Sequence, residues 1–403
     1  MNTSRLPNQK QPLSFSLASL RSAAAVVAAL LAASPSARAQ STWDGNTLPT
    51  PGDGLLWTDP LNWSGDALPG GADVIFANAL AGVGTIFLNG DQSANSLTFT
   101  ESDTLGAYGT NNFLNNLSGA VTVTSGDFAT INASYGGTNG IILSGGGTLF
   151  LNNPFPTYTG NITVDGVGTT LLHRQEGPGV QYNGINSAQE FGRFDQLTLG
   201  ASTTVRTITL TNGGEYKIIN TGNNPELNFK NIVIGSGGGT LNLGAGYILQ
   251  NLDDLGQITA TTEAFTKAGK GRLVITGTMA VNNPLAGIVN INGGMLSLDN
   301  ITSQTVGANT YNRFTGIAAL GTTLNINSGG TLMINSGTQS FSDVPIINAN
   351  NGSIIAVNGQ DHIFGYAVAA AASAASLNIT GTSTLLTMIP PHSQRRGNRA
   401  VFT

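Results

Sequence analysis

The densest group of ionisable side chains in this 403-residue chain lies between residues 171 and 197. Two carboxylates can act as the acid and the base or nucleophile of glycoside hydrolysis. A carboxylate-bound cation together with a basic proton acceptor can cleave a polysaccharide by another route. Glu176 with Glu190 or Asp195 could form the pair, and Arg174 or Arg193 could abstract a proton or stabilise charge. The group comprises His173, Arg174, Glu176, Glu190, Arg193 and Asp195.

The competing interpretation of this group is a solvated loop that carries ordinary charge. Residue spacing alone does not give the separation of the carboxylates, so we expect no catalytic residue and no enzymatic activity. The motif "KAGKG" (267–271) lacks the spacing and the final Ser or Thr of a phosphate-binding loop. His362 and His392 have no histidine four residues away, and the chain has no Cys. We therefore expect neither a metal site nor a cofactor.

All three tryptophans, Trp43, Trp57 and Trp63, lie close together in the sequence. Aromatic side chains in such a group can form a sugar-binding platform. They can also cover the end of a repeat structure, where strand edges and apolar interior would otherwise meet water. We expect the second role, that of an N-terminal cap.

A short phrase recurs along the chain: "GGGTLFL" (145–151), "GGGTLNL" (237–243), "GKGRLVI" (269–275), "GGMLSL" (293–298) and "GGTLMI" (329–334). Its apolar residues alternate with period two, which predicts strands with one buried face. The glycines before these strands recur every 21 to 25 residues, with longer gaps of 46, 32 and 36. We interpret the 46 as two units and the other two as one unit plus a loop.

A unit of this length holds about three short strands and cannot bury its own apolar face. Stacked units can, so we predict an all-β chain folded as a parallel β-helix of about 15 rungs, roughly 4.8 Å apart. The glycine before each strand would provide a positive φ at a corner. Thr and Asn would form ladders on the outer faces, because like charges repeated on successive rungs would repel each other.

The charge distribution excludes two classes of partner. All 21 acidic residues but only 9 of the 16 basic ones lie between Gln40 and Pro390, and no Lys or Arg lies between Gln40 and His173. Nucleic acids and anionic membranes both require a basic surface. We expect a monomer whose partners are surface polysaccharides or other cells.

The N-terminus has the three parts of a secretory signal peptide. Basic residues precede the apolar run "AAAVVAALLAA" (23–33), and "ARA" (37–39) is a small-residue cleavage site. The apolar run is too short to span a bilayer, which takes about 20 residues. We predict cleavage between Ala39 and Gln40, no transmembrane segment, and a mature protein that is secreted or held at the outer cell surface.

Two stretches, "GGGTLFLNNPFPTYTGNITVDGVGTTLL" (145–172) and "KAGKGRLVITGTMAVNNPLAGIVNINGGMLSL" (267–298), resemble the autotransporter-associated β-strand repeat. Residues 43–76 resemble the segment that commonly precedes such repeats. The resemblance implies an exported passenger with a β-helix, and it implies no defined catalytic residues. Right-handed winding follows from the family and from the general preference of crossover connections.

The expected organisation has four parts. Residues 1–39 are the signal peptide, 40–130 the cap and first rungs, 131–360 the repeats, and 361–403 terminal rungs with an irregular tail. We predict a structural or adhesive role. Two alternatives remain open: a polysaccharide lyase or glycoside hydrolase with its site on the 173–195 loop, and a non-functional fragment of a longer autotransporter, because no alternating barrel strands follow residue 385.

Overall fold

The chain divides into two units, residues 1–39 and 40–403. The computed structural model describes Ala39 and much of the second unit, and the description below concerns the second unit alone. The described residues are 39–45, 52–77, 84–108, 113–115, 117, 119–152, 157–174, 195–199, 207–219, 231–245, 247–251, 257–260, 262–275, 285, 287–299, 302–306, 309–313, 323–335, 339–341, 346–357, 362–364 and 376–388.

The regular elements among the described residues are all strands, apart from the 3-10 helix η1 (Pro60–Asn62). The strands make five sheets. The first sheet contains, in order, β1 (Gln40–Trp43), β2 (Asp73–Phe76), β5 (Ser96–Phe99), β8 (Gly119–Val123), β11 (Ile141–Ser144), β14 (Ile162–Asp165), β17 (Thr207–Thr211), β19 (Asn231–Ile234) and β22 (Gln257–Ala260).

The second sheet is the longest, with 12 strands. In order they are β3 (Thr85–Phe87), β6 (Thr104–Gly106), β9 (Phe128–Ile131), β12 (Thr148–Leu151), β15 (Thr170–Arg174), β18 (Gly214–Ile219), β20 (Gly239–Leu243), β23 (Phe265–Ala268), β25 (Ile288–Ile291), β29 (Thr323–Ile326), β32 (Ile346–Asn350) and β35 (Ser376–Thr380).

Three shorter sheets complete the stack. The third contains β13 (Thr157–Tyr158), β10 (Ser134–Gly137), β7 (Phe113–Asn115) and β4 (Gln92–Ser93). The fourth contains β16 (Asp195–Leu199), β21 (Tyr247–Asn251), β24 (Arg272–Ile275), β26 (Gly294–Asp299), β30 (Gly330–Asn335), β33 (Ser353–Val357) and β36 (Thr384–Met388). The fifth contains β27 (Thr302–Val306), β28 (Asn309–Arg313), β31 (Gln339–Phe341) and β34 (His362–Phe364).

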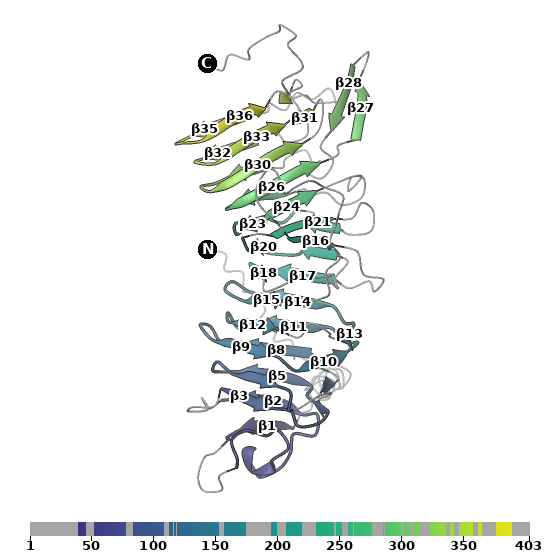
Figure 1. Cartoon of the computed structure of the whole chain (residues 1–403), viewed down its shortest axis with the longest axis vertical. Helices are drawn as coiled ribbons and strands as arrows, with labels where there is room; N and C mark the ends of the chain where they lie inside the picture. The colour runs from purple at the N-terminus through teal and green to yellow at the C-terminus, as the bar shows by residue number, and fades with distance from the viewer. Residues whose placement is uncertain are drawn as a thin grey trace, which may run out of the picture. The chain divides into compact units, whose positions relative to one another are not determined.

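From β2 onward, and apart from the antiparallel pair β27 and β28, successive strands of the chain belong to different sheets, so each turn of the chain adds a strand to two or three of them. For example, β8, β9 and β10 belong to the first, second and third sheets, and β11, β12 and β13 pair with them one rung further on. The stack follows chain order, as the colours of Figure 1 show. This arrangement of long parallel sheets is consistent with a β-solenoid, and it confirms the all-β prediction with about three strands per unit.

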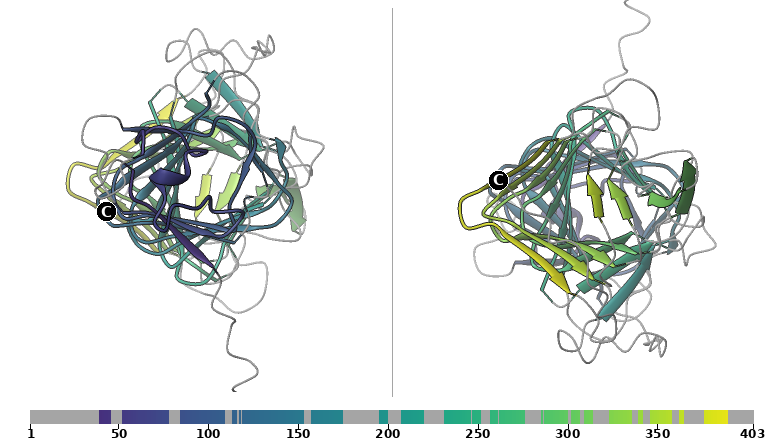
Figure 2. Two further views of the ribbon diagram at one scale, coloured as in Figure 1. Left: turned by 90° about the horizontal axis from the view of Figure 1, so that it is seen from below. Right: turned by 90° about the horizontal axis from the view of Figure 1, so that it is seen from above.

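The interior follows from the period-two alternation. In β12, Leu149 and Leu151 are buried while Thr148 and Phe150 face outward. Register aligns Leu149 with Ala129 below and Leu171 above, and Leu171 with Tyr216. Nearly all buried apolar side chains of the described residues belong to one cluster. Figure 2 shows the strands arranged around this common interior from both ends.

The 46-residue gap contains one rung and not two, so that prediction was wrong. β15 pairs directly with β18, with Thr170 opposite Glu215. β14 likewise pairs directly with β17. The extra residues therefore lie in the connection between β15 and β17, which contains β16.

The 32-residue gap marks a change of sheet and is not one unit plus a loop, so that prediction was wrong. The phrases that start at residues 145 and 237 form strands of the second sheet, whereas those at 269, 293 and 329 form strands of the fourth. The 36-residue gap is one unit plus an insertion, as predicted. The insertion contains the hairpin of β27 and β28, whose strands are antiparallel.

The corner glycines have the expected positive φ at some strands and a different role at others. Gly168 has a positive φ of 80°, but at Gly330 the positive φ falls one residue earlier, at Gly329. A Cβ on Gly330 would overlap the backbone carbonyl oxygen of Ile291 in the preceding rung. The absence of a side chain at this corner thus permits close approach of two backbones.

Candidate functional site

The structure describes the predicted catalytic residues only in part. Glu176, Glu190 and Arg193 lie outside the described residues. His173 lies in β15, aligned with Leu151 and Ile218, and Asp195 begins β16, aligned with Tyr247. Both ends of the expected 173–195 loop are therefore strand residues, and the connection itself starts after Arg174.

The three tryptophans form a buried cluster at the N-terminal end of the stack. Trp43, Trp57 and Trp63 are each at most 1% exposed. The ring centroids of Trp43 and Trp63 are 5.0 Å apart and those of Trp57 and Trp63 4.9 Å apart, both edge-to-face. Trp63 Nε1 donates a hydrogen bond of 2.8 Å to the carbonyl of Trp57. Because a sugar-binding platform needs exposed ring faces, the burial excludes that role and supports the cap.

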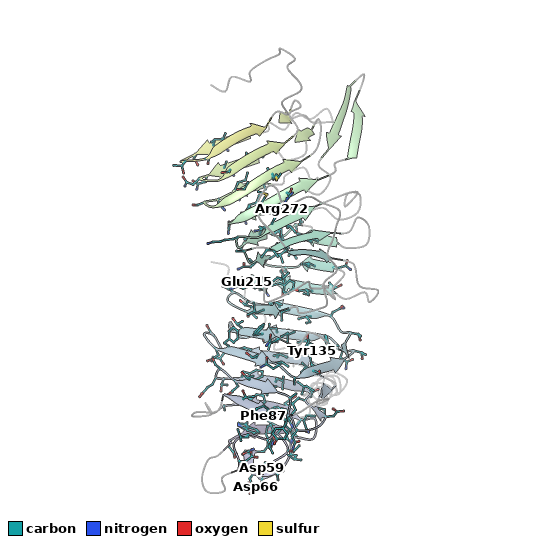
Figure 3. The ribbon with its side chains drawn as sticks, in the orientation of Figure 1. Asp59, Asp66, Phe87, Tyr135, Glu215 and Arg272 are labelled. Atoms are coloured by element: carbon teal, nitrogen blue, oxygen red, sulfur yellow. The ribbon has the colours of Figure 1, made fainter. Side chains whose placement is uncertain are left out.

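The loop that carries Trp57 and Trp63 is held by side-chain hydrogen bonds. Asn62 is buried; its Nδ2 donates to Asp53 Oδ1 at 2.7 Å and its Oδ1 accepts from the Gly54 amide at 2.8 Å. Burial would raise the pKa of Asp53, but hydrogen bonds from the Leu56 amide, the Asn62 side chain and the Leu55 amide together lower it. Asp59 caps η1 through the Leu61 amide at 3.0 Å (Figure 3).

Lys267 is a fully buried base in the wall of the second sheet. Its register partners are Leu241 and Ile291, so it occupies a place in an otherwise apolar column. Its Nζ donates to the carbonyl oxygens of Gly269, Gly271 and Gly293 at 2.8, 2.6 and 2.8 Å. The side chain thus joins its own corner to the corner of the next rung.

The protonation of Lys267 depends on two opposing effects. Burial lowers the pKa of its amine to about 7 from an ordinary 10.5. An ammonium has three donors, matching the three carbonyls, whereas a neutral amine has two. Near neutral pH the amine can therefore exist in both forms.

Asparagine ladders run along the outside of the second sheet. Asn378 Nδ2 donates to Asn348 Oδ1, Asn348 Nδ2 to Asn325 Oδ1, and Asn325 Nδ2 to Asn290 Oδ1, each at 2.8 Å. Each amide thereby donates to one neighbour and accepts from the other, which a charged residue repeated at the same position could not do. This is the outer-face ladder that the low charge predicted.

Sequence reasoning missed two buried ionisable residues, Lys267 and Asp103. A signal for both was present. Lys267 lies two residues after Phe265, and Asp103 two residues before Leu105, so period-two alternation places each on the side of a buried apolar residue. The pattern "KAGKG" by itself does not show that its first lysine points inward from a strand.

The described residues contain no group of three His, Cys, Asp or Glu side chains that could hold a metal ion. The same part of the chain has no helix with the length and apolarity that a membrane crossing requires. Comparison of the sequence and structure with protein-family models, curated proteins and solved structures found no match.

Proposed function

We propose that the chain is an exported β-solenoid passenger of the autotransporter-associated β-strand repeat type, wound right-handedly, with a structural or adhesive role at the cell surface. In this role the protein is a non-enzymatic scaffold that presents its faces and loops to polysaccharides or to other cells. The proposal combines the resemblance of residues 145–172 and 267–298 to that repeat with the stacked parallel sheets.

The observation that carries the proposal is the use of neutral polar side chains to join rungs. The ladder from Asn290 to Asn378 adds side-chain hydrogen bonds to the backbone pairing of four successive strands of the second sheet. Such a face is rigid and uncharged, which suits contact with neutral polymers in varying salt.

Export is supported by the position of the first strand. β1 begins at Gln40, the residue after the predicted cleavage site, and the boundary between the two units falls at the same place. Mass spectrometry of the protein released by the producing cells would then give a mature chain that starts at Gln40. A released chain that retains residues 1–39 would contradict cleavage.

The role itself is tested by incubating the purified protein with neutral and acidic polysaccharides and measuring both retention on the polymer and new chain ends. We expect retention without cleavage. New chain ends that disappear in a Glu176→Ala, Glu190→Ala, Asp195→Ala variant would replace the proposal with a carbohydrate-active enzyme. If the protein is not retained on any polymer and cleaves none, the adhesive role is contradicted.

A further inference from the structure

The carboxyl group of Asp103 lies inside the solenoid wall, where carboxylates are rare. Asp103 is 3% exposed and immediately precedes β6. Thr104 pairs with Thr130, and the Thr130 amide donates to the Asp103 carbonyl at 2.8 Å. Alternation places the Asp103 side chain on the same side as the buried Leu105. Its Oδ2 is buried and accepts no hydrogen bond.

The charged groups around Asp103 are all acidic. Glu101 lies in the same corner, and Asp127 lies in the corner of the next rung; both carboxylates act on Asp103. The strands around it, β3, β5, β8 and β9, contain no ionisable residue, and neither do residues 77–84 and 145–147. The sequence has no Lys or Arg from Gln40 to His173, so no cationic side chain of this region neutralises the site.

A buried carboxylate that has one oxygen without a hydrogen bond and lies beside two like charges binds a proton more tightly than usual. Burial, then Glu101, then Asp127 raise the pKa of Asp103 to about 6. A protonated carboxyl removes the like-charge repulsion and greatly reduces the desolvation penalty. Among the described residues no three acidic or histidine side chains converge as metal ligands, which favours a proton over a cation as the bound species.

We propose that Asp103 is a proton-binding switch that closes the corner between β6 and β9 in mild acid and loosens it when the carboxyl ionises. The corner is held by few bonds. The Phe128 amide donates to Ser102 Oγ at 2.9 Å, Ser102 Oγ donates to Asp127 Oδ1 at 3.3 Å, and the Asn132 amide donates to the Leu105 carbonyl at 2.8 Å. These bonds, with the one from Thr130, open when the corner loosens.

The direction of the effect follows from the proton affinity of the closed corner. The closed state holds the proton up to about pH 6, whereas an open corner with an ordinary carboxyl loses it near 3.8. The extra stability of the closed corner is complete below pH 3.8 and is lost as the pH rises to 6. Between pH 4.5 and pH 7.5 the closing equilibrium falls by roughly 30-fold.

Amide hydrogen exchange of Phe128 and Thr130 in the full chain tests this inference, after correction for the intrinsic effect of pH on exchange. We expect roughly 30-fold more protection at pH 4.5 than at 7.5 in the wild type and in Asp91→Asn, a control at an exposed carboxylate. In Asp103→Asn, which is neutral at every pH, protection should not change. A variant that keeps the wild-type change would overturn the proposal.

Two further measurements hold whether or not Asp103→Asn folds. The carboxyl carbon of Asp103 in the wild type should titrate in its NMR signal well above an ordinary aspartate, and a midpoint near 4 would overturn the proposal. Calcium chloride added at pH 7.5 should leave the exchange of Phe128 and Thr130 unchanged. Protection restored by calcium in the wild type would make the site a cation site and not a proton switch.

Discussion

Replacing Gly330 by Ala tests whether the rungs pack as closely as the structure has them. The new Cβ would overlap the carbonyl oxygen of Ile291 and lie 3.0 Å from the Asn327 carbonyl oxygen. The Asn327 amide donates to the Ile291 carbonyl at 2.9 Å, and the Gly330 amide donates to the Asn327 carbonyl at 2.8 Å. The clash is with backbone, so it can be relieved only by moving one rung relative to the other.

The expected loss follows from three contributions. Overpacking against a fixed neighbour costs about 1–3 kcal/mol. The two hydrogen bonds contribute roughly 1 kcal/mol each. Alanine restricts the unfolded chain, which offsets about 0.4–1 kcal/mol. Gly330→Ala should therefore lower the free energy of unfolding by about 3 kcal/mol.

Urea denaturation followed by circular dichroism measures this loss, with Gly140→Ala as the matched control. Gly140 also lacks a positive φ, and its nearest contact for a Cβ is the Asn161 carbonyl oxygen at 3.6 Å, an ordinary distance. The control should stay within about 1 kcal/mol of the wild type. If Gly330→Ala destabilised the protein no more than Gly140→Ala, the close approach of rungs would be refuted.

Three other outcomes follow from the same structure. Asn348→Ala interrupts the middle of the ladder and should cost about 1–2 kcal/mol in urea denaturation; no loss would show that the side-chain ladder does not contribute. Because burial lowers the pKa of Lys267 to about 7, the wild type should gain stability relative to Lys267→Met as the pH rises from 7 to 10.5. Thermal unfolding at several pH values measures this difference in stability. A difference that does not change with pH would mean that the carbonyls keep the ammonium charged. The tryptophan fluorescence should resist quenching by iodide, since all three rings are buried. Strong quenching would show that the rings are exposed to solvent.

The sequence was sufficient to predict the repeating architecture because the interior repeats at short range. Leu149 and Leu151 in one rung and Leu241 and Leu243 in another are the same signal in the same sheet, and alternation alone identifies both as buried. The corner glycines and the low charge can likewise be seen in short stretches of the sequence. These features predicted stacked parallel strands, and the structure has them.

Rung connectivity could not be predicted from the same signals. The glycine phrase marks strands of two different sheets, so a constant phrase concealed the change of sheet between Gly239 and Gly271. The 46-residue gap from Gly168 to Gly214 contains one rung, because β15 pairs directly with β18. The length of the gap alone had suggested two rungs. The pairing of β15 with β18 is a long-range property: alternation shows which face of each strand is buried, but not which strand lies beside it.

The candidate site was less predictable for a physical reason. The 171–197 group was selected by charge density, yet charge density does not give the separation of carboxylates in space. Asp103 and Lys267 are single residues whose environment comes from neighbouring rungs. Their burial could be inferred from alternation, whereas their partners, the three carbonyls around Lys267 and the acidic neighbours of Asp103, depend on how corners stack.

The pairing of β15 with β18 tests the stacked architecture most directly, and the lack of Cys in the chain makes a disulfide test clean. Thr170 and Glu215 are register partners on adjacent strands, so Thr170→Cys with Glu215→Cys should form a disulfide on mild oxidation. Thr170→Cys with Thr240→Cys, two strands and about 10 Å apart, should not. A disulfide in the second pair, or its absence in the first, would contradict the stacking on which the proposed scaffold rests.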